Sequence, residues 1–430
     1  TATIQPDGSG ASLRIQVKQQ QALVKVKSEN ADKTAEISDL QGKIEDERKR
    51  AAAHEVSFDR MKECVICQDA DKCIAFFPCS HLALCETCQH SVEECPMCRE
   101  KIEEKRKIKI AGTGFHVPDK VLTNFDLEKM VDTSDEWIVT RTGIRERRIG
   151  REDQMTSDLA VEAARKTLKN AGLKVKDIDL IIVATSTPDT IFPSTACWVQ
   201  SKLGADHIPA FVISAGCTGF LYGMIVAEGL ILSGIKKRIL LIGSEFLTKV
   251  TNWKDRNTCV LFGDAAGAVV LEESHDDSGM LSSYWKADGK LGDLLSIPAG
   301  GTRIPPTAQT IAQDLHYLHM KGNDVFKHAV KRMGEAAVSA LKKAGLEKED
   351  IDYLIPHQAN IRIIEATGRR LKLPPEKVYI NIQKYGNVSV ATIPIALHEL
   401  NESGKLKDGT IVVMDAFGAG FTWAAIAYRC

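Results

Sequence analysis

The chain has 430 residues, a formal net charge of −1 and 44% hydrophobic residues. This length is enough for two or three domains with a large core. A net charge near zero gives no global field that would draw the protein to nucleic acid or to an anionic membrane, and no stretch combines basic and apolar residues as a secretory signal does. We therefore expect a cytoplasmic protein that binds neither nucleic acid nor membrane.

Residues 1–60 begin with a polar stretch that includes Asp7–Gly10, a composition typical of a linker. The rest of this segment is rich in Lys, Glu, Gln and Ala. Ile37, Leu40 and Ile44 follow the spacing that places apolar side chains on one side of a helix. The pattern fits a short dimerising coiled coil and equally a single solvated helix, because too few heptads are regular to decide.

Residues 61–106 contain a block of cysteines. Eight of the twelve cysteines lie between Cys64 and Cys98, and such a cluster without a secretory signal indicates metal binding before disulfides. Four close pairs supply eight ligands, enough for two tetrahedral Zn²⁺ sites, while Cys73 falls outside the pairs. A segment this short has little core of its own, so its folding should depend on the metal. The pairs are Cys64 with Cys67, Cys79 with His81, Cys85 with Cys88, and Cys95 with Cys98.

The order and spacing of these ligands resemble a RING finger. The resemblance implies that the first and third pairs bind one zinc ion and that the second and fourth pairs bind the other. RING fingers recruit ubiquitin-conjugating enzymes, and Ile66, Pro96 and Arg99 match the positions that dock the enzyme and hold the ubiquitin conjugate. The alternative is a zinc-folded spacer or dimerisation unit without ligase activity.

Residues 107–430 alternate strand-like and helix-like patterns, which is typical of an α/β protein. Within them, residues 162–182 and 335–355 are copies of one sequence pattern. Each copy predicts an amphipathic helix, a Gly that ends the helix in the left-handed conformation, a short loop and a buried strand. We therefore expect a duplicated α/β domain with two similar halves, 107–280 and 281–430.

Cys217 ends an apolar strand-like run and opens a helix rich in small residues. A helix N-terminus carries partial positive charge that favours the thiolate, so this position suits a nucleophile. His357 and Asn387 lie far downstream, beside a strand end and a turn, where loops of α/β proteins carry chemistry. A distant His and Asn held in place there can supply the hydrogen bonds that a carbon nucleophile needs. The sequence therefore predicts an enzyme.

Residues 107–430 resemble 3-oxoacyl-[acyl-carrier-protein] synthase III of the thiolase superfamily. The likeness implies a five-layer αβαβα fold, a homodimer, and decarboxylative Claisen condensation of a short acyl-CoA, such as acetyl-CoA, with malonyl-acyl-carrier protein. Cys217 would carry the acyl group, His357 and Asn387 would hydrogen-bond the malonyl thioester oxygen, and no redox cofactor would be needed. Gly216 stands where Ala is usual, and we expect it to widen the site slightly. The resemblance rests on motifs in the same order at 132–145, 262–267, 322–326, 356–360 and 417–423.

The resemblance also assigns supporting roles. The backbone N–H groups of Cys217 and Gly420 would form the oxyanion hole, and Phe192 would reach into the partner subunit's acyl tunnel. Lys327 and Arg362 match basic residues where an acidic carrier protein docks. Trp137 and Arg256 would lie on either side of the CoA adenine. The full set of positions that match contacts to CoA is Thr133, Trp137, Arg141, Arg256, Asn323 and Asn360.

Two functions of different classes follow. In the first, the chain is a condensing enzyme with an N-terminal zinc module. In the second, it is a RING-type ubiquitin ligase that uses the thiolase fold as a dimeric scaffold or acyl-CoA sensor. A scaffold has no physical need for Cys217, His357 and Asn387 together, so the sequence favours the enzyme.

Overall fold

The computed structural model describes residues 4–6, 13–15, 74–75, 82–84, 94, 96–97, 99 and 106–430. The chain divides into two compact units, Thr1–Lys105 and Arg106–Cys430. The larger unit contains the elements that position the predicted catalytic residues.

In the N-terminal unit, β1 (Ile4–Pro6) pairs antiparallel with β2 (Leu13–Ile15), and β3 (Ile74–Ala75) pairs antiparallel with β4 (Leu82–Leu84). β2 lies at the start of the stretch for which the sequence predicted a helix, and its apolar-polar-apolar alternation favours an extended chain. Several predicted residues of this unit lie outside the described residues: Ile37, Leu40, Ile44, Cys64, Ile66, Cys67, Cys79, His81, Cys85, Cys88, Cys95 and Cys98.

The larger unit contains two mixed β-sheets. The first has the order β5–β11–β10–β8–β9, with β8 parallel to β9 and β10, and β11 antiparallel to β5 and β10. Its strands are β5 (Lys107–His116), β8 (Leu180–Ala184), β9 (Ala210–Ile213), β10 (Arg238–Phe246) and β11 (Asp264–Ser274).

The second sheet has the order β12–β17–β16–β15 and repeats the arrangement of the first. β15 is parallel to β16, and β17 is antiparallel to both of its neighbours. Its strands are β12 (Gly279–Ala287), β15 (Tyr353–Pro356), β16 (Ile411–Gly418) and β17 (Thr422–Arg429).

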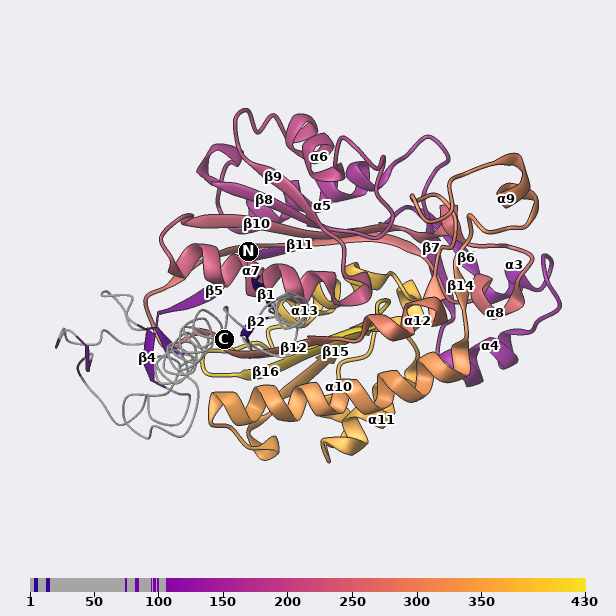
Figure 1. The fold of residues 1–430 in the computed structure, drawn as a ribbon. Coiled ribbons are helices and arrows are strands. Elements are labelled where there is room, and N and C mark those ends of the chain that lie inside the picture. The colour runs from indigo at the N-terminus through magenta and orange to yellow at the C-terminus, as the bar shows by residue number, and fades with distance from the viewer. Residues whose placement is uncertain are drawn as a thin grey trace, which may run out of the picture. The chain divides into compact units, whose positions relative to one another are not determined.

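Helices and sheets alternate in five layers, as the family resemblance implied (Figure 1). α5 and α6 cover the outer face of the first sheet, α7 and α13 lie between the sheets, and α10 packs on the outer face of the second sheet with α11 beside it. α7 is apolar around most of its circumference because both sheets bury it, whereas α5 and α10 have one apolar side. The bounds are α5 (Thr156–Asn170), α6 (Thr195–Leu203), α7 (Gly219–Leu232), α10 (Gly322–Ala344), α11 (Ile361–Arg370) and α13 (Thr392–Glu402).

Shorter elements surround these layers. None of the helices that the structure describes is long and apolar enough to cross a bilayer. The remaining helices and strands are β6 (Lys120–Thr123), α3 (Asn124–Leu127), α4 (Asp135–Thr142), β7 (Glu146–Ile149), α8 (Arg256–Cys259), β13 (Leu295–Ser296), α9 (Ala308–Ala312), β14 (His319–Met320) and α12 (Ile382–Tyr385).

The repeat in the sequence corresponds to matching elements in the two halves. α5 and α10 each end at a glycine in the left-handed conformation, Gly172 with φ 67° and Gly345 with φ 69°. A 3₁₀ turn follows each glycine, at Val175–Asp177 and Lys348–Asp350, and leads into β8 and β15. The same local sequence therefore forms the same local structure twice.

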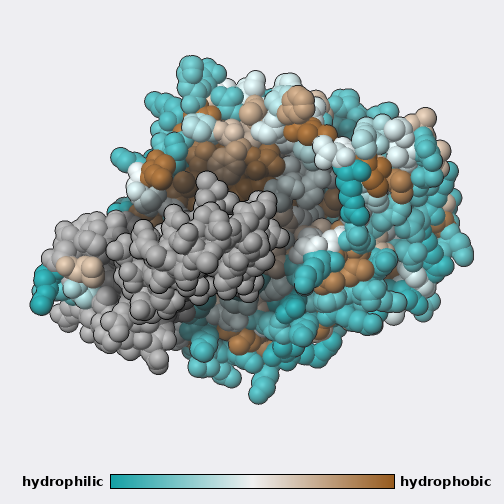
Figure 2. Space-filling view, in the orientation of Figure 1, coloured by the Kyte–Doolittle hydropathy of each residue, from teal (hydrophilic) through white to brown (hydrophobic). Residues whose placement is uncertain are grey.

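Hydrophobic surface gathers at the edge of the first sheet, around β8 and β9, whereas hydrophilic residues cover most of the remaining visible surface of the larger unit (Figure 2). β9 pairs with β8 on one side only, and its Phe211 is 36% exposed. On and before α6, three more large side chains are exposed: Ile191 at 77%, Phe192 at 85% and Trp198 at 39%. An unpaired strand edge with apolar side chains is suited to a protein interface.

Candidate active site

Most predicted site residues meet at one cavity of about 540 Å³ in the larger unit. Helices α4 and α10, the turn before α7, and the segments after β15 and α12 contribute its walls. A more open hollow of about 900 Å³ is lined by side chains of both charge signs, such as Arg151, Asp153 and Glu162, and the predicted catalytic residues do not line it. The predicted residues that line the first cavity are Trp137, Arg141, Cys217, Asn323, His357, Asn360, Arg362 and Asn387.

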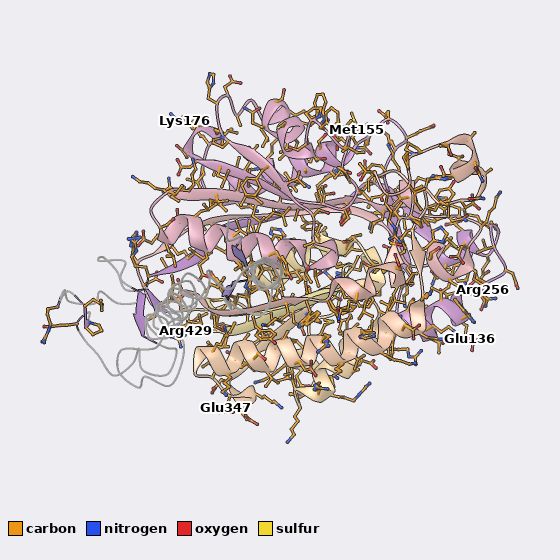
Figure 3. All side chains as sticks on the ribbon, in the orientation of Figure 1. Glu136, Met155, Lys176, Arg256, Glu347 and Arg429 are labelled. Carbon is orange, nitrogen blue, oxygen red and sulfur yellow. The ribbon has the colours of Figure 1, made fainter. Side chains whose placement is uncertain are left out.

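One end of this cavity is formed around Trp137 on α4. The guanidinium carbon of Arg256 lies 4.1 Å from the Trp137 ring centroid, and that of Arg141 lies 4.7 Å from it. Figure 3 labels Arg256 and Glu136, the neighbour of Trp137 on α4. A guanidinium nitrogen of Arg256 also lies 3.7 Å from a carboxylate oxygen of Asp132. Thr133 does not line the cavity, and its buried Oγ1 has no hydrogen-bond partner among the described residues.

Asn360 and Arg362 begin α11 beside the cavity. Asn360 caps the helix because its Oδ1 accepts the Arg362 N–H at 2.9 Å, and its Nδ2 donates to the Arg141 carbonyl at 3.0 Å. The Arg362 guanidinium carbon lies 5.2 Å from the centroid of Phe326 on α10. Lys327 does not line the cavity; its ammonium group lies 3.8 Å from an Asp324 carboxylate oxygen on the exposed side of α10.

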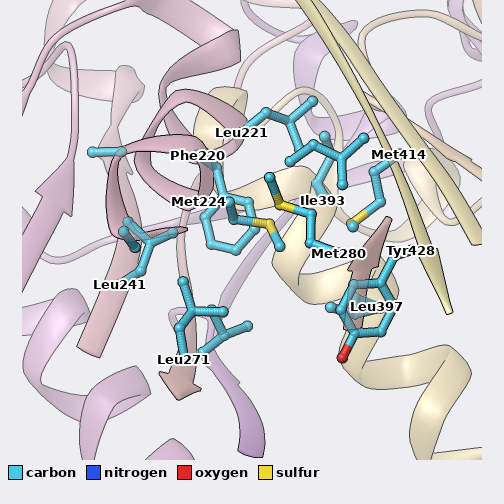
Figure 4. Packing of buried hydrophobic residues seen from close by; sticks show 14 of the residues in the cluster. Phe220, Leu221, Met224, Leu241, Leu271, Met280, Ile393, Leu397, Met414 and Tyr428 are labelled. Carbon is cyan, nitrogen blue, oxygen red and sulfur yellow. The ribbon is translucent and has the colours of Figure 1, made fainter. Parts of the chain in front are cut away.

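Cys217 lies in the 3₁₀ turn Gly216–Thr218 that leads into α7. The sulfur is held deep in the unit because Phe220, Leu221 and Met224 of α7 pack into the core between the sheets (Figure 4). Met414 of the second sheet and Ile393 and Leu397 of α13 pack in the same cluster. Burial of these side chains fixes α7, and with it the turn that carries the sulfur.

Two close backbone approaches shape the turn around Cys217. Gly216 has φ 54°, and a Cβ at this residue would lie 2.7 Å from the Ala419 nitrogen. The smaller residue therefore meets a backbone requirement and a close contact, which corrects the expectation that it simply widens the site. A Cβ at Gly418 would lie 2.5 Å from the Cys217 nitrogen. Gly420, predicted for the oxyanion hole, does not line the cavity, whereas its neighbour Ala419 does.

Burial raises the pKa of the Cys217 thiol to about 11, although a hydrogen bond from Ser389 lowers it and Glu245 raises it further. This result corrects the prediction that the helix N-terminus keeps Cys217 as a thiolate. Desolvation of the sulfur outweighs the partial charge of the helix end. A nucleophilic role for Cys217 would therefore require the thiol to lose its proton.

His357 follows β15 and is buried, and burial lowers its pKa to about 3, so its imidazole is neutral. Its Nδ1 lies 2.7 Å from the Thr392 hydroxyl, which also lies 2.8 Å from the Ser389 carbonyl oxygen. The hydroxyl can donate to either group, so it can serve either imidazole tautomer. Nε2 has no hydrogen-bond partner among the described residues, and His357 lines the cavity.

The side-chain amide of Asn387 has a fixed orientation. Its Oδ1 accepts the Ser389 N–H at 2.9 Å, which leaves Nδ2 as the free donor. Its backbone also bridges to the strand-like segment at Phe262, through bonds to Leu261 and Gly263. Asn387 is 7% exposed and lines the cavity, so a substrate oxygen there can meet a preorganised N–H donor.

No pattern in the sequence indicated a buried carboxyl group beside this site. Glu245 on β10 is fully buried, and its Oε1 accepts the Ser389 hydroxyl at 3.0 Å. Burial raises the pKa of Glu245 to about 7, against several hydrogen bonds that lower it. Because Glu245 and Ser389 are 144 residues apart, local sequence patterns could not have paired them.

One further predicted residue of the larger unit, Phe192, does not line the cavity. Phe192 is largely exposed before α6. In the N-terminal unit, Arg99 is exposed with φ 64°, and Pro96 is half-buried. The roles predicted for these residues stay predictions.

Known proteins similar to this chain agree with the fold. Family models for 3-oxoacyl-[acyl-carrier-protein] synthase III match residues 211–289 and, for the C-terminal part, residues 341–430. A model for the C3HC4-type zinc finger, the RING finger, matches residues 60–105.

Similar full-length proteins cover the larger unit. The beta-ketoacyl-[acyl-carrier-protein] synthase III of Caldanaerobacter subterraneus subsp. tengcongensis is 56% identical over 322 residues, which are 75% of this chain and 97% of the relative. That of Symbiobacterium thermophilum is 52% identical over 324 residues, 75% of this chain and 98% of the relative. The crystal structure of 3-oxoacyl-[acyl-carrier-protein] synthase III from Aquifex aeolicus VF5 is 49% identical, covers 76% of this chain and 100% of its own, and has a TM-score of 0.69. The chain belongs to the 3-oxoacyl-[acyl-carrier-protein] synthase III family.

Proposed function

We propose that this chain catalyses the decarboxylative condensation of a short acyl-CoA, such as acetyl-CoA, with malonyl-acyl-carrier protein, the initiating step of fatty acid synthesis. The observation that carries the proposal is the meeting of Cys217, His357 and Asn387 at one cavity, in a chain of this family. The product is a 3-oxoacyl-acyl-carrier protein. No step requires a redox cofactor.

In the first half-reaction, the sulfur of Cys217 attacks the thioester carbon of the acyl-CoA. The C–S bond to CoA breaks, the acyl group stays on Cys217, and the released CoA takes up a proton. Backbone N–H groups of Cys217 and Gly420 would hold the carbonyl oxygen while it carries negative charge. Gly418 packs so closely against Cys217 that no side chain fits between them. This close backbone approach supports the assignment of the oxyanion hole to this turn.

In the second half-reaction, the malonyl thioester loses carbon dioxide and leaves an enolate. In the tautomer that this step needs, Thr392 donates to Nδ1 of His357 and Nε2 carries the proton. Nε2–H and Nδ2–H of Asn387 would then both donate to the enolate oxygen. The enolate carbon attacks the acyl carbon on Cys217, and the thiolate of Cys217 leaves. Both donors are neutral and held in place before the substrate arrives, so little reorganisation accompanies the charge.

CoA would enter along the end of the cavity formed by Trp137. Stacking of the adenine between Trp137 and Arg256 requires two contacts of about 3.5 Å each, and the present 4.1 Å separation leaves no space for a ring. Arg256 must therefore move outward when the base binds. Arg141, Asn323 and Asn360 line the same cavity as Trp137 and Cys217, which supports their assignment to the phosphates and the pantetheine arm.

An acidic carrier protein would dock beside the same opening. Arg362 lines the cavity and lies over the ring of Phe326. Lys327 is the next residue after Phe326 on α10. Both are cations on the N-terminal ends of α10 and α11, so they could attract a carboxylate-rich partner.

We also propose that the larger unit is a homodimer formed through the exposed edge of the first sheet. The unpaired side of β9 and the exposed side chains of Ile191, Phe192 and Trp198 support this interface. Association along β9 would pair its free backbone groups and cover these apolar side chains. Phe192 would then be available to the partner's acyl tunnel.

Native mass spectrometry after incubation with acetyl-CoA tests the function and the dimer together. We expect the wild-type chain to be a dimer that gains one acetyl group per subunit, and Cys217→Ala to remain a dimer without the acetyl group. Condensation with malonyl-acyl-carrier protein should fall on the order of 10³-fold or more in the variant, because the covalent intermediate cannot form. Acetylation that persists without Cys217, or the lack of an adduct with any short acyl-CoA, would contradict the mechanism.

The N-terminal cysteine block would hold two zinc ions. The donor set fits this metal because seven thiolates and one imidazole form four close pairs, the ligands that tetrahedral Zn²⁺ prefers. We expect metal analysis of the full chain to give two zinc ions, and Cys88→Ser to lower the content by about one ion. Cys73→Ser is the matched control and should keep both ions. Equal metal content in the two variants would contradict the ligand assignment.

A second candidate function is a RING-type ubiquitin ligase, and the match of residues 60–105 to the RING finger model supports it. Ile66, Pro96 and Arg99 would dock a ubiquitin-conjugating enzyme, with the thiolase fold as dimeric scaffold or acyl-CoA sensor. The two functions use separate residues, so Cys217→Ala should not affect ubiquitin transfer. We favour the synthase because a scaffold does not require the three residues that meet at the cavity.

A further inference from the structure

Glu245 sits in a pocket of donors directly behind the Cys217 turn. Its carboxyl oxygens accept the Ser186 N–H at 3.1 and 3.2 Å, the Thr185 hydroxyl at 3.3 Å and the Thr187 hydroxyl at 2.5 Å. The Thr185 hydroxyl accepts the Thr187 N–H, and the Thr187 hydroxyl accepts the Phe246 N–H. Both hydroxyl protons therefore point at the carboxyl group, which stabilises a carboxylate despite its burial.

Ser389 connects Glu245 to the catalytic residues. Its hydroxyl donates to Oε1 of Glu245 at 3.0 Å. The turn Ser389–Ala391 packs against the turn Gly216–Thr218, both Ser389 and Cys217 line the cavity, and a hydrogen bond from Ser389 lowers the pKa of the Cys217 thiol. The Ser389 N–H holds Oδ1 of Asn387, and its backbone has φ 48°, a conformation that residues other than glycine rarely adopt. A strained residue that contacts three functional groups indicates a role in the site.

The hydroxyl of Ser389 has one proton, so it can donate to Glu245 or to Cys217 but not to both. When it donates to the Glu245 carboxylate, its oxygen can accept the S–H of Cys217. When it donates to a Cys217 thiolate, a protonated Glu245 can donate to it. The protonation states of Cys217 and Glu245 are therefore coupled through Ser389.

We propose that Glu245 takes the proton of Cys217 through Ser389, so that the thiolate forms without a charge leaving the buried site. The S–H bond of Cys217 breaks as its proton moves to Ser389, and the Ser389 proton moves to Glu245. The result is a thiolate beside a neutral carboxylic acid. Glu245 touches no substrate and acts on Cys217 only through Ser389. The inference rests on the proposed function, in which Cys217 is the nucleophile.

The protons balance over one catalytic cycle. After the thiolate attacks the acyl-CoA, CoA leaves as a thiolate and takes one proton from water, while Glu245 keeps its own. Condensation then releases Cys217 as a thiolate again, next to the neutral Glu245. Each cycle consumes one solvent proton, as decarboxylative condensation requires.

Among the residues that the structure describes, the hydrogen-bond partners of Glu245 include no second base. The segment after β8 presents neutral Thr185, Ser186 and Thr187, and the 3₁₀ turn Ser389–Ala391 presents neutral Ser389. Cys217 is the titratable group whose charge couples to Glu245.

The test is the pH dependence of Cys217 alkylation by iodoacetamide, followed by peptide mass spectrometry on the full chain. For the wild type we expect a rise in rate near pH 7, where Glu245 titrates, and a second rise at alkaline pH. In Glu245→Gln and Ser389→Ala, the rise in alkylation rate near pH 7 should disappear, and the rise at alkaline pH should remain. The rates of both variants at pH 8 should fall on the order of tenfold or more, because only the thiolate reacts.

Asp264→Asn is the matched control. Asp264 is also buried, on the neighbouring strand β11, but its partners are Gly150 and Thr248. Its variant should keep the wild-type profile. If the alkylation rate of Glu245→Gln still rises near pH 7, the proposal is wrong. If circular dichroism shows that this variant is unfolded, the same measurement on Ser389→Ala decides the question.

Acetylation by acetyl-CoA, measured in parallel, separates this inference from the proposed function. One outcome would refute the synthase but support the proton transfer. In it, the wild type takes no acetyl group, while Glu245→Gln still abolishes the rise in alkylation rate near pH 7. Normal acetylation of the wild type with identical alkylation profiles in all variants would refute only the proton transfer.

Discussion

Replacing His357 or Asn387 by Ala is expected to slow condensation about 10²–10³-fold while acetylation of Cys217 stays within a few-fold of the wild type. In the proposed mechanism each variant removes one donor to the enolate oxygen, and the charge on that oxygen develops only after the acyl group is on Cys217. The two half-reactions are measured separately, as acetyl transfer from acetyl-CoA and as carbon dioxide release from malonyl-acyl-carrier protein.

His398→Ala provides the control for this comparison. His398 on α13 is also partly buried with a lowered pKa, and its Nδ1 lies 2.8 Å from the Thr113 hydroxyl, but it does not line the cavity. Its variant should keep both half-reactions. If His357→Ala suppressed acetylation as strongly as decarboxylation, His357 would serve the nucleophile and not the enolate.

Asp415→Asn is expected to become more stable relative to the wild type as the pH rises. Asp415 on β16 is fully buried, and neither carboxyl oxygen has a hydrogen-bond partner within the described part of the chain. Burial raises its pKa from 3.8 to about 8. The folded state therefore keeps a proton that the unfolded state releases, and stability is lost as the pH rises from about 4 to 8.

At pH 7 this loss is on the order of 4 kcal/mol. The neutral amide of the variant does not titrate, so the difference in unfolding free energy between variant and wild type should grow by about that amount between pH 4 and pH 7. Melting temperatures of both proteins across this range provide the measurement. The amide itself costs about 1–3 kcal/mol if its N–H groups stay unpaired, but this cost is the same at every pH.

Asp264→Asn serves as the reference for this experiment. Its carboxyl group accepts bonds from Gly150 and Thr248, and burial raises its pKa only to about 6. The difference between Asp264→Asn and the wild type should therefore grow less between pH 4 and pH 7 than that of Asp415→Asn. A difference between Asp415→Asn and the wild type that stays constant with pH would show that Asp415 is ionised in the folded state or finds a partner there.

The elements of the larger unit could be predicted because their signals are local. The repeated sequence at 162–182 and 335–355 contains a helical period, a glycine for the left-handed position and a strand, and the structure forms these elements in both halves. The same regularity placed His357 directly after β15. The functional assignment needed more than periodicity, since it depended on motifs spread over the whole segment.

The sequence by itself determined the two similar halves, the layered α/β architecture and the residue types around the cavity. Only the tertiary structure showed that Glu245 and Ser389 lie behind Cys217, that Arg256 lies directly on Trp137, and that Thr133 stays away from the cavity. It also reversed the expected protonation of Cys217. Helix and strand patterns depend on neighbouring residues, whereas burial, pKa and polar partners depend on segments that only folding brings together.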